Sequence, residues 1–185
     1  RVANRVGATR VLILPGDPEG DVKREECHEW LNEAIAKSLP IANELGITLT
    51  IANLGFAAKT YGSSDYINAT CKAAEPELKA TYDVGNFLMA KEGSIDALNK
   101  VFPNTIHVHF KDWEIVSSER DGAFWGMDDR LYMGAALGDG ICDLPGVVAR
   151  LKELNYEGYI SVEYEGVADP WKAVDRGIAY LNTLL

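Results

Sequence analysis

The segment 106–112, with the sequence IHVHFKD, alternates apolar and polar side chains along one predicted strand. Successive side chains of a strand point to opposite faces, so His107, His109 and Lys111 share one face and the apolar residues share the other. Burying imidazoles and an ammonium without partners is costly. The segment therefore predicts one of two arrangements. It is either a strand with a solvated edge, or a strand packed under helices whose polar face opens into a pocket able to hold a metal ion.

Composition narrows the class of protein. The chain of 185 residues is long enough for one domain with a real core. Its net charge of -10 argues against binding a nucleic-acid backbone or an anionic membrane surface. The three cysteines are odd in number and form no CxxC pair, which argues against a disulfide framework or zinc knuckle and favours a reducing cytoplasm. We expect neither a signal peptide nor a membrane span, because no apolar run is long enough.

The pattern of predicted elements is a strand followed by a helix, repeated five times. We expect strands at 9–14, 47–52, 78–83, 106–112 and 159–163, and helices at 22–45, 65–74, 94–101, 143–155 and 170–185. Pro40 should kink or break the first helix, Gly46 should end it, and Ser94 should cap the third. Residues 112–142 show little periodicity, and their aromatic side chains favour an ordered lid.

This order calls for parallel strands joined by crossover helices, as in a doubly wound sheet or part of a (β/α)8 TIM barrel. Polar side chains share one face of several strands. They are Thr48, Thr50, Thr81, Asp83, His107, His109, Lys111, Ser161, Glu163 and Glu165. A doubly wound sheet is covered by helices on both faces and would be apolar on both. One polar face fits the lumen of a barrel better, so we expect the α/β barrel.

Three of these side chains should meet at the carboxyl end of the barrel, where ligands bind in such folds. Asp83, His109 and Glu163 come from separate strands at that end. Taken singly, each has an ordinary explanation, as a turn cap, a hydrogen-bonded polar residue or an ion-pair partner. Together they predict a metal site with mixed oxygen and nitrogen ligands, which suits Mn²⁺, Mg²⁺, Co²⁺ or Zn²⁺.

At these residues the chain resembles the sugar phosphate isomerase/epimerase family, the xylose isomerase-like TIM barrels. The matching segments are 11–16 (VLILPG), 82–86 (YDVGN), 107–112 (HVHFKD), 138–143 (GDGICD) and 159–165 (YISVEYE). The resemblance implies a divalent metal, manganese first, held by Glu, Asp, His and Glu on successive strands. Asp83, His109 and Glu163 match the last three of these ligands, and Lys111 resembles a lysine that contacts substrate in many members.

The chain departs from the family pattern in two ways. Ala52 stands where the first metal-binding Glu belongs, and a methyl group can neither ligate metal nor move a proton. A full barrel needs about 250 residues. We therefore expect residues 1–185 to form a single domain with the last five strand–helix units of a barrel and without its N-terminal units. The open edges of such a sheet would be covered in a longer chain or in a homo-oligomer.

The resemblance implies chemistry on a small sugar, keto-sugar or polyol. The metal stabilises an enediolate while a carboxylate moves the neighbouring proton. Glu163 and Lys111 are the expected catalytic residues. The expected substrate contacts are His107, Lys111, Asn86 and Trp113. His107 is also explained as a hydrogen-bonded lumen residue, Lys111 as an ion-pair partner of Asp112 or Glu163, and Trp113 as ordinary loop packing.

Three other functions compete with isomerisation or epimerisation. The same enolisation followed by loss of a hydroxyl gives a dehydratase, as in the inosose-dehydrating relatives. Ala52 instead supports a non-catalytic sugar-binding subunit. A DNA-repair relative with a zinc cluster is disfavoured by the acidic composition and by the presence of only three histidines.

Overall fold

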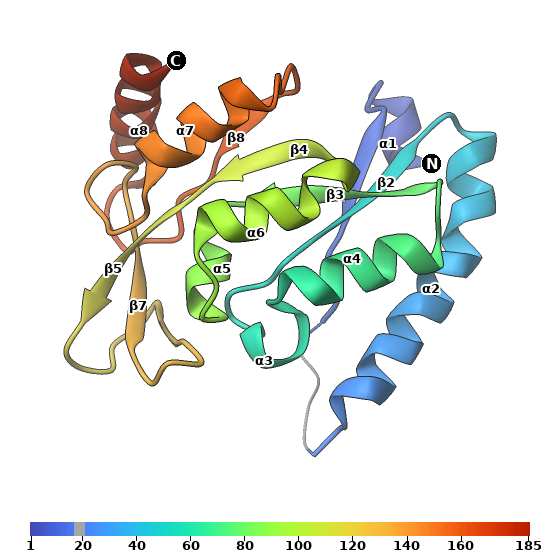
Figure 1. Ribbon diagram of the computed structural model, residues 1–185, viewed down its shortest axis with the longest axis horizontal. Coiled ribbons are helices and arrows are strands. Elements are labelled where there is room, and N and C mark those ends of the chain that lie inside the picture. Colours follow the sequence, from blue (N-terminus) through green and yellow to red (C-terminus); the bar gives the residue numbers. More distant parts are fainter. Residues whose placement is uncertain (17–20) are drawn as a thin grey trace.

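The computed structural model of the protein describes residues 1–16 and 21–185. Its centre is a parallel five-stranded sheet with the order β1-β2-β3-β4-β8. The strands are β1 (Arg10–Ile13), β2 (Thr48–Ala52), β3 (Leu78–Asp83), β4 (Thr105–Phe110) and β8 (Ile160–Val162). The sheet curls into a half-barrel with helices along its outer side, which confirms the prediction of a partial (β/α)8 barrel (Figure 1).

Helices connect the strands and cover the outer face of the sheet. They are α1 (Val2–Arg5), α2 (Arg24–Glu44), α3 (Ala58–Tyr61), α4 (Ser64–Ala73), α5 (Asn86–Met89), α6 (Ser94–Val101), α7 (Leu144–Glu153) and α8 (Pro170–Leu184), with a 3₁₀ turn at Phe102–Asn104. The outward residues Ile51, Tyr82, Val108 and Phe110 are completely buried. Removing these large apolar side chains from water is the main force that holds the helices on the strands.

The inner face of the sheet is polar along its length. The Thr81 hydroxyl donates to Oγ1 of Thr50 on the neighbouring strand at 2.9 Å. Nε2 of His107 lies 2.9 Å from Oγ of Ser161. These cross-strand pairs satisfy polar groups that could not face a helix layer, and they explain why the alternating pattern predicted a barrel rather than a doubly wound sheet.

Two local predictions are corrected and one is confirmed. Helix α2 is not broken at Pro40 but continues to Glu44, and the residues Leu39 and Ala42 on either side of the proline are buried. Gly93, not Ser94, is the N-cap of α6; the Ser94 hydroxyl instead donates to the Val84 carbonyl at 2.7 Å. Gly46 follows the end of α2 with a φ of +65°, the left-handed conformation that glycine adopts readily.

The segment 112–142, in which we expected an ordered lid, contains a second sheet. Strands β5 (Asp112–Val116), β6 (Ala123–Trp125) and β7 (Leu131–Ala135) pair antiparallel in the order β5-β7-β6. All five residues of the central strand β7 are buried. A strand covered on both faces has no alternation, which is why periodicity did not reveal it.

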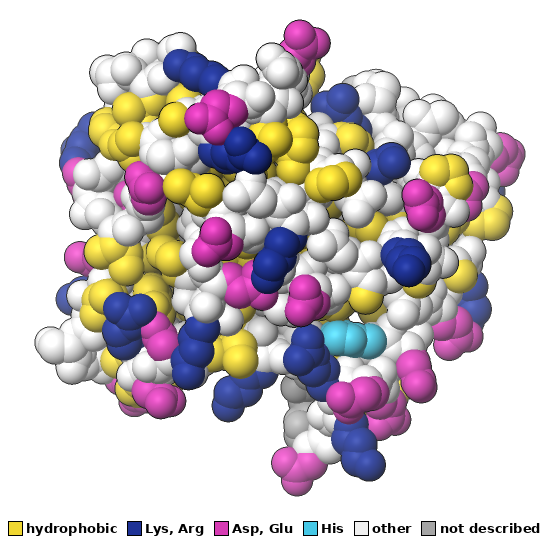
Figure 2. Space-filling view, in the orientation of Figure 1, with side chains coloured by type: hydrophobic (Ala, Val, Ile, Leu, Met, Phe, Trp, Pro, Cys, Tyr) yellow, Lys and Arg dark blue, Asp and Glu magenta, His cyan; other side chains and the backbone are white. Residues whose placement is uncertain are grey.

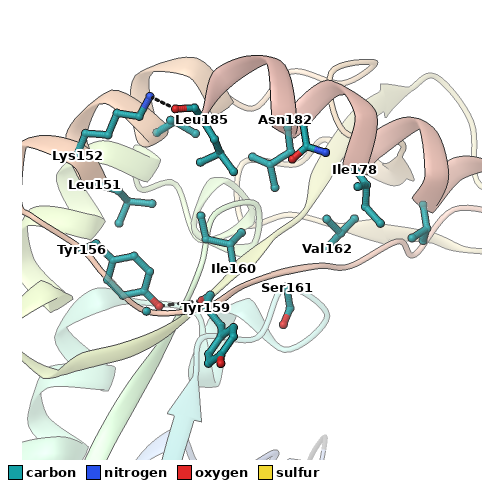
Figure 3. Close-up of a pocket in the computed structure, with 14 residues that line it drawn as sticks. Leu151, Lys152, Tyr156, Tyr159, Ile160, Ser161, Val162, Ile178, Asn182 and Leu185 are labelled. Atoms are coloured by element: carbon teal, nitrogen blue, oxygen red, sulfur yellow. Dashed lines mark hydrogen bonds between the residues drawn. The ribbon is translucent and has the colours of Figure 1, made fainter.

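The far end of the parallel sheet borders an apolar groove of about 700 Å³ between β8, α7 and α8. Leu151, Ile160, Val162 and Ile178 line it (Figure 3). Leu181 also lines the groove. In the described part of the chain, β8 pairs only with β4 and β1 only with β2. Both ends of the sheet are therefore edges, as the count of strand–helix units predicted.

The molecular surface is charged with both signs. On the face shown in Figure 2, lysine and arginine side chains are interspersed with aspartates and glutamates. Among residues 1–16 and 21–185, no helix has the length and apolarity needed to span a bilayer.

Candidate metal centre

Three potential metal ligands converge at the carboxyl ends of β3, β4 and β8. Asp83 is paired with His109 in the register of β3 and β4. The Glu163 amide donates to the Phe110 carbonyl at 2.9 Å, which extends the pairing of β8 with β4 by one residue. As a result, one ligand atom from each of Asp83, His109 and Glu163 lies within 4.8 Å of the others. The sequence had predicted this convergence from strand phase alone.

The donor set fits a divalent cation. Two carboxylates and an imidazole combine the ligands that Mn²⁺, Mg²⁺ and Zn²⁺ accept, and three protein ligands leave coordination positions open. The ligands border a cavity of about 60 Å³, which is room for about two water molecules. Its wall contains Leu12, Leu14, Ala52, Asn53, Leu54, Phe56, Asp83, Asn86, His109, Lys111, Glu163 and Glu165.

Asp83 is fixed by the turn that follows its strand. Its Oδ1 accepts hydrogen bonds from the amides of Gly85 at 3.0 Å and Asn86 at 2.9 Å. Its Oδ2 lies 3.4 Å from Nζ of Lys111. Burial raises the pKa of Asp83, while the Lys111 charge acts in the opposite direction. Rotation of the carboxylate is limited by the turn, so Oδ2 remains directed at the lysine and the cavity.

Lys111 binds the carboxylates that surround it. Its Nζ lies 2.8 Å from Oε2 of Glu163 and 2.9 Å from Oε1 of Glu165, and the side chain is only 4% exposed. Burial alone would lower the pKa of Lys111, but Asp83, Glu165 and Glu163 together raise it. The ammonium therefore keeps its charge inside the half-barrel.

Glu163 links the imidazole and the ammonium. Its Oε1 lies 3.0 Å from Nδ1 of His109. Burial would raise the pKa of Glu163, but the hydrogen bond from His109 and the charge of Lys111 outweigh burial and lower the pKa to about 2. Glu163 is accordingly a carboxylate at neutral pH, the form that a metal ligand or a proton acceptor requires.

Ala52 lies on the inner face of the half-barrel, as strand phase predicted. It is 3% exposed and contributes to the cavity wall. With a methyl group at this position, three candidate ligands remain in place of the four implied by the family resemblance.

The predicted substrate contacts divide into two groups. Lys111 and Asn86 line the cavity. His107 lies deeper in the sheet, bonded to Ser161, and its pKa is lowered by burial and then by the neighbouring His109. Trp113 is 1% exposed and packs edge-on against Phe124, with its ring centre 5.7 Å from Nζ of Lys111. Among the described residues, neither His107 nor Trp113 belongs to the cavity wall, and Trp113 packs next to Lys111.

Two carboxylates that hold parts of the site in place were not among the predicted site residues. Glu165 holds Lys111, and its position two residues after Glu163 was the signal for a shared face. Asp112 is buried and accepts hydrogen bonds from the four amides of Trp113, Gly138, Gly140 and Cys142 at 2.9–3.0 Å. Asp112 therefore fixes the 138–142 loop to the strand end that carries Lys111. No sequence period could have indicated that role.

The protein is a parallel α/β half-barrel in which two carboxylates and an imidazole meet at the carboxyl ends of the strands. The chain matches the family described as xylose isomerase-like TIM barrel over residues 1–184, and it belongs to that family.

Individual relatives agree with this assignment. The chain is 26% identical over 183 residues to an inosose dehydratase of Geobacillus kaustophilus, which covers 90% of this chain and 56% of the relative. It spans about half the length of the curated relatives it matches, or less. Among solved structures, the IOLI protein with a bound zinc atom superposes with a TM-score of 0.76 at 18% identity, covering 98% of this chain and 64% of that protein. D-psicose 3-epimerase in the presence of D-fructose gives a TM-score of 0.73 at 16% identity, covering 99% and 66%. These two structures share the fold.

Proposed function

We propose that this chain carries the metal centre of an enzyme that isomerises or epimerises a small sugar, keto-sugar or polyol. The observation that carries the proposal is the convergence of Asp83, His109 and Glu163 at the carboxyl end of the half-barrel. The zinc-binding and sugar-epimerising relatives of the same fold support it. We expect the cation to be divalent, with Mn²⁺ as the first candidate.

The proposed chemistry divides between the cation and the protein. A divalent cation at this centre would supply charge stabilisation for an enediolate. Glu163 is held in its ionised form and would exchange the proton on the carbon next to the carbonyl. Lys111 would neutralise developing negative charge, and Asn86 would orient a substrate hydroxyl from the cavity wall.

Ala52 limits what this site can do alone. Epimerisation returns the proton to the opposite face of the enediolate and needs a second acid there, which a methyl group cannot provide. We therefore propose that the activity of the chain is low, or that its role is sugar binding without turnover. The substitution Ala52→Glu, which restores the missing carboxylate, tests both ideas.

A dehydratase is the second candidate, because the curated relatives named above are inosose dehydratases. It would begin with the same proton removal and end with loss of a hydroxyl. Product analysis separates the two reactions, since isomers keep the mass of the substrate and a dehydratase product lacks one water.

The proposed setting follows from the same observations. The three cysteines are buried and free, which suits the cytoplasm. Sugars or polyols are the proposed partners. We further propose that the open edges at β1 and β8 are covered by more strand–helix units or by another subunit, so binding should be measured on the longest available chain.

Exchange of the carbon-bound proton in heavy water gives the sharpest test of this function. D-fructose and inosose are incubated with Mn²⁺ and either the natural chain or Ala52→Glu, and deuterium uptake is followed by NMR. We expect slow exchange or none with the natural chain and an increase of at least about tenfold with Ala52→Glu. Ala52→Gln is the matched control, because it has the same length without the carboxylate.

The outcomes separate enzyme from binding protein. Exchange that needs both Mn²⁺ and the carboxylate introduced by Ala52→Glu supports the enzyme. If Ala52→Glu binds Mn²⁺ and sugar without exchange, the binding role replaces it. Absence of both metal and sugar binding contradicts the proposed function.

A further inference from the structure

The Lys111 ammonium contacts the same carboxylates that would bind a metal ion. It lies 2.8 Å from Glu163 and 3.4 Å from Asp83, which are two of the three candidate metal ligands. A third carboxylate, Glu165, bonds the same ammonium at 2.9 Å and is not one of the three. The lysine thus has two ligand partners and one partner outside the ligand set.

We infer that Lys111 is a built-in competitor for the metal, and that Glu165 receives its ammonium when the metal binds. The inference rests on the metal centre proposed above. A divalent cation bound to Asp83 and Glu163 would repel an ammonium in the same small cavity. The ammonium must therefore give up these two carboxylates, and Glu165 is the acceptor that it already contacts.

The charges of the site fit this exchange. Three carboxyl groups face one ammonium, so the ionised site has negative charge in excess. Adding a divalent cation gives three positive charges for three carboxylates. The metal then balances Asp83 and Glu163, while Lys111 balances Glu165.

Ala52 makes the competition decisive for this chain. With a fourth carboxylate, a metal would gain one more ligand and Lys111 one more partner. With a methyl group at position 52, the two remaining carboxylates are shared between cation and ammonium. The Lys111 ammonium therefore lies among the carboxylates that would hold the metal, beside a cavity of only about 60 Å³.

Metal affinity of the folded chain tests the inference without measuring activity. Mn²⁺ binding is titrated by calorimetry and by the paramagnetic relaxation of water, for the natural chain and Lys111→Met. We expect Lys111→Met to bind Mn²⁺ about ten- to a hundredfold more tightly. Lys37→Met, a change at an exposed lysine of α2, should leave the affinity unchanged.

Substitution of Glu165 should change the Mn²⁺ affinity in the opposite direction. Glu165→Gln removes the acceptor for the displaced ammonium, so Mn²⁺ binding should weaken by about tenfold. In the Lys111→Met background the same change should have little effect, because no ammonium needs an acceptor. Equal weakening in both backgrounds would mean that Glu165 attracts or ligates the metal directly, and this part of the inference would be overturned.

Separate controls distinguish a loss of folding from a loss of metal binding. Should Lys111→Met fail to fold, Lys111→Gln provides the neutral variant with a polar tip, and circular dichroism decides which variant is measured. If Ala52→Glu binds Mn²⁺ but neither neutral variant binds it more tightly than the natural chain, only the competition is overturned. If no folded variant binds a divalent cation, the proposed metal centre is overturned, and the competition with it.

Discussion

Nζ of Lys111 and Nδ1 of His109 bind the two oxygens of one carboxylate, that of Glu163, at 2.8 Å and 3.0 Å. A carboxylate held at both oxygens by side chains two residues apart at the end of β4 has little freedom to rotate. The same strand phase that places the imidazole and the ammonium on the inner face therefore orients the acidic residue of the neighbouring strand. The protein itself therefore orients the Glu163 carboxylate, although Lys111 must give up this contact when a metal binds Glu163.

Asp83→Asn should weaken Mn²⁺ binding by more than about a hundredfold, because a neutral amide replaces a charged ligand. Calorimetry measures the affinity. Asp121→Asn, in an exposed turn, is the control. Unchanged affinity in Asp83→Asn would remove Asp83 from the ligand set.

The pH dependence of stability reports on Glu163. Its pKa is lowered in the folded state from 4.5 to about 2, so its ionised form favours folding. That contribution is complete above pH 4.5 and is lost as the pH falls toward 2. The raised pKa of Asp83 acts with the opposite sign. The informative quantity is therefore the difference between the natural chain and Glu163→Gln, measured by urea unfolding with EDTA. We expect this difference to shrink below pH 4.5. A constant difference from about pH 6 to about pH 3 would contradict the ion pairing.

Asp112→Asn should destabilise the protein by about 3 kcal/mol, because an amide group cannot accept all four backbone hydrogen bonds. Hydrogen exchange should rise first at residues 138–142, the loop that these bonds hold. Asp139→Asn is a matched control in the same loop, with an exposed carboxylate. If both variants exchange alike, Asp112 does not hold the loop.

Gly85→Ala should disturb the turn that fixes Asp83. A Cβ at position 85 would lie 2.7 Å from Nε1 and 2.8 Å from Cδ1 of the buried Trp113. We expect reduced stability, red-shifted tryptophan fluorescence and weaker Mn²⁺ binding. At Gly93 a Cβ meets its nearest neighbour at 3.5 Å, so Gly93→Ala should be mild. Equal effects at the two positions would argue against close packing at Gly85.

Strand phase explains why so much of the site was accessible from sequence. The alternation in 106–112 and 159–165 assigned His109, Lys111, Glu163 and Glu165 to one face, and a parallel fold brings strand ends together. Contacts that follow no periodic pattern in the sequence could not be predicted. Asp112 binds amides of a loop 26 or more residues away, and Trp113 is buried beneath Lys111 although its segment resembled a lid. The strand Leu131–Ala135 is buried on both faces and gives no alternation.

The helix boundaries illustrate how packing overrides local preference. Pro40 lacks an amide hydrogen and would end an isolated helix. In α2 the apolar residues on both sides of it are buried against the sheet, and the helix continues to Glu44. Ser94 has the residue type of a cap, but it is the first residue of α6 and its hydroxyl donates to the Val84 carbonyl.

A crystal structure of the chain soaked with Mn²⁺, with the metal located by anomalous scattering, tests the central claim most directly. The account predicts one ion per chain, with oxygens of Asp83 and Glu163 and a nitrogen of His109 at about 2.0–2.3 Å. Nζ of Lys111 should have moved away from Asp83 and Glu163 while staying against Glu165. An ion bound elsewhere, or a fully soaked crystal whose Lys111 still bridges Asp83 and Glu163 with no metal beside them, would contradict it.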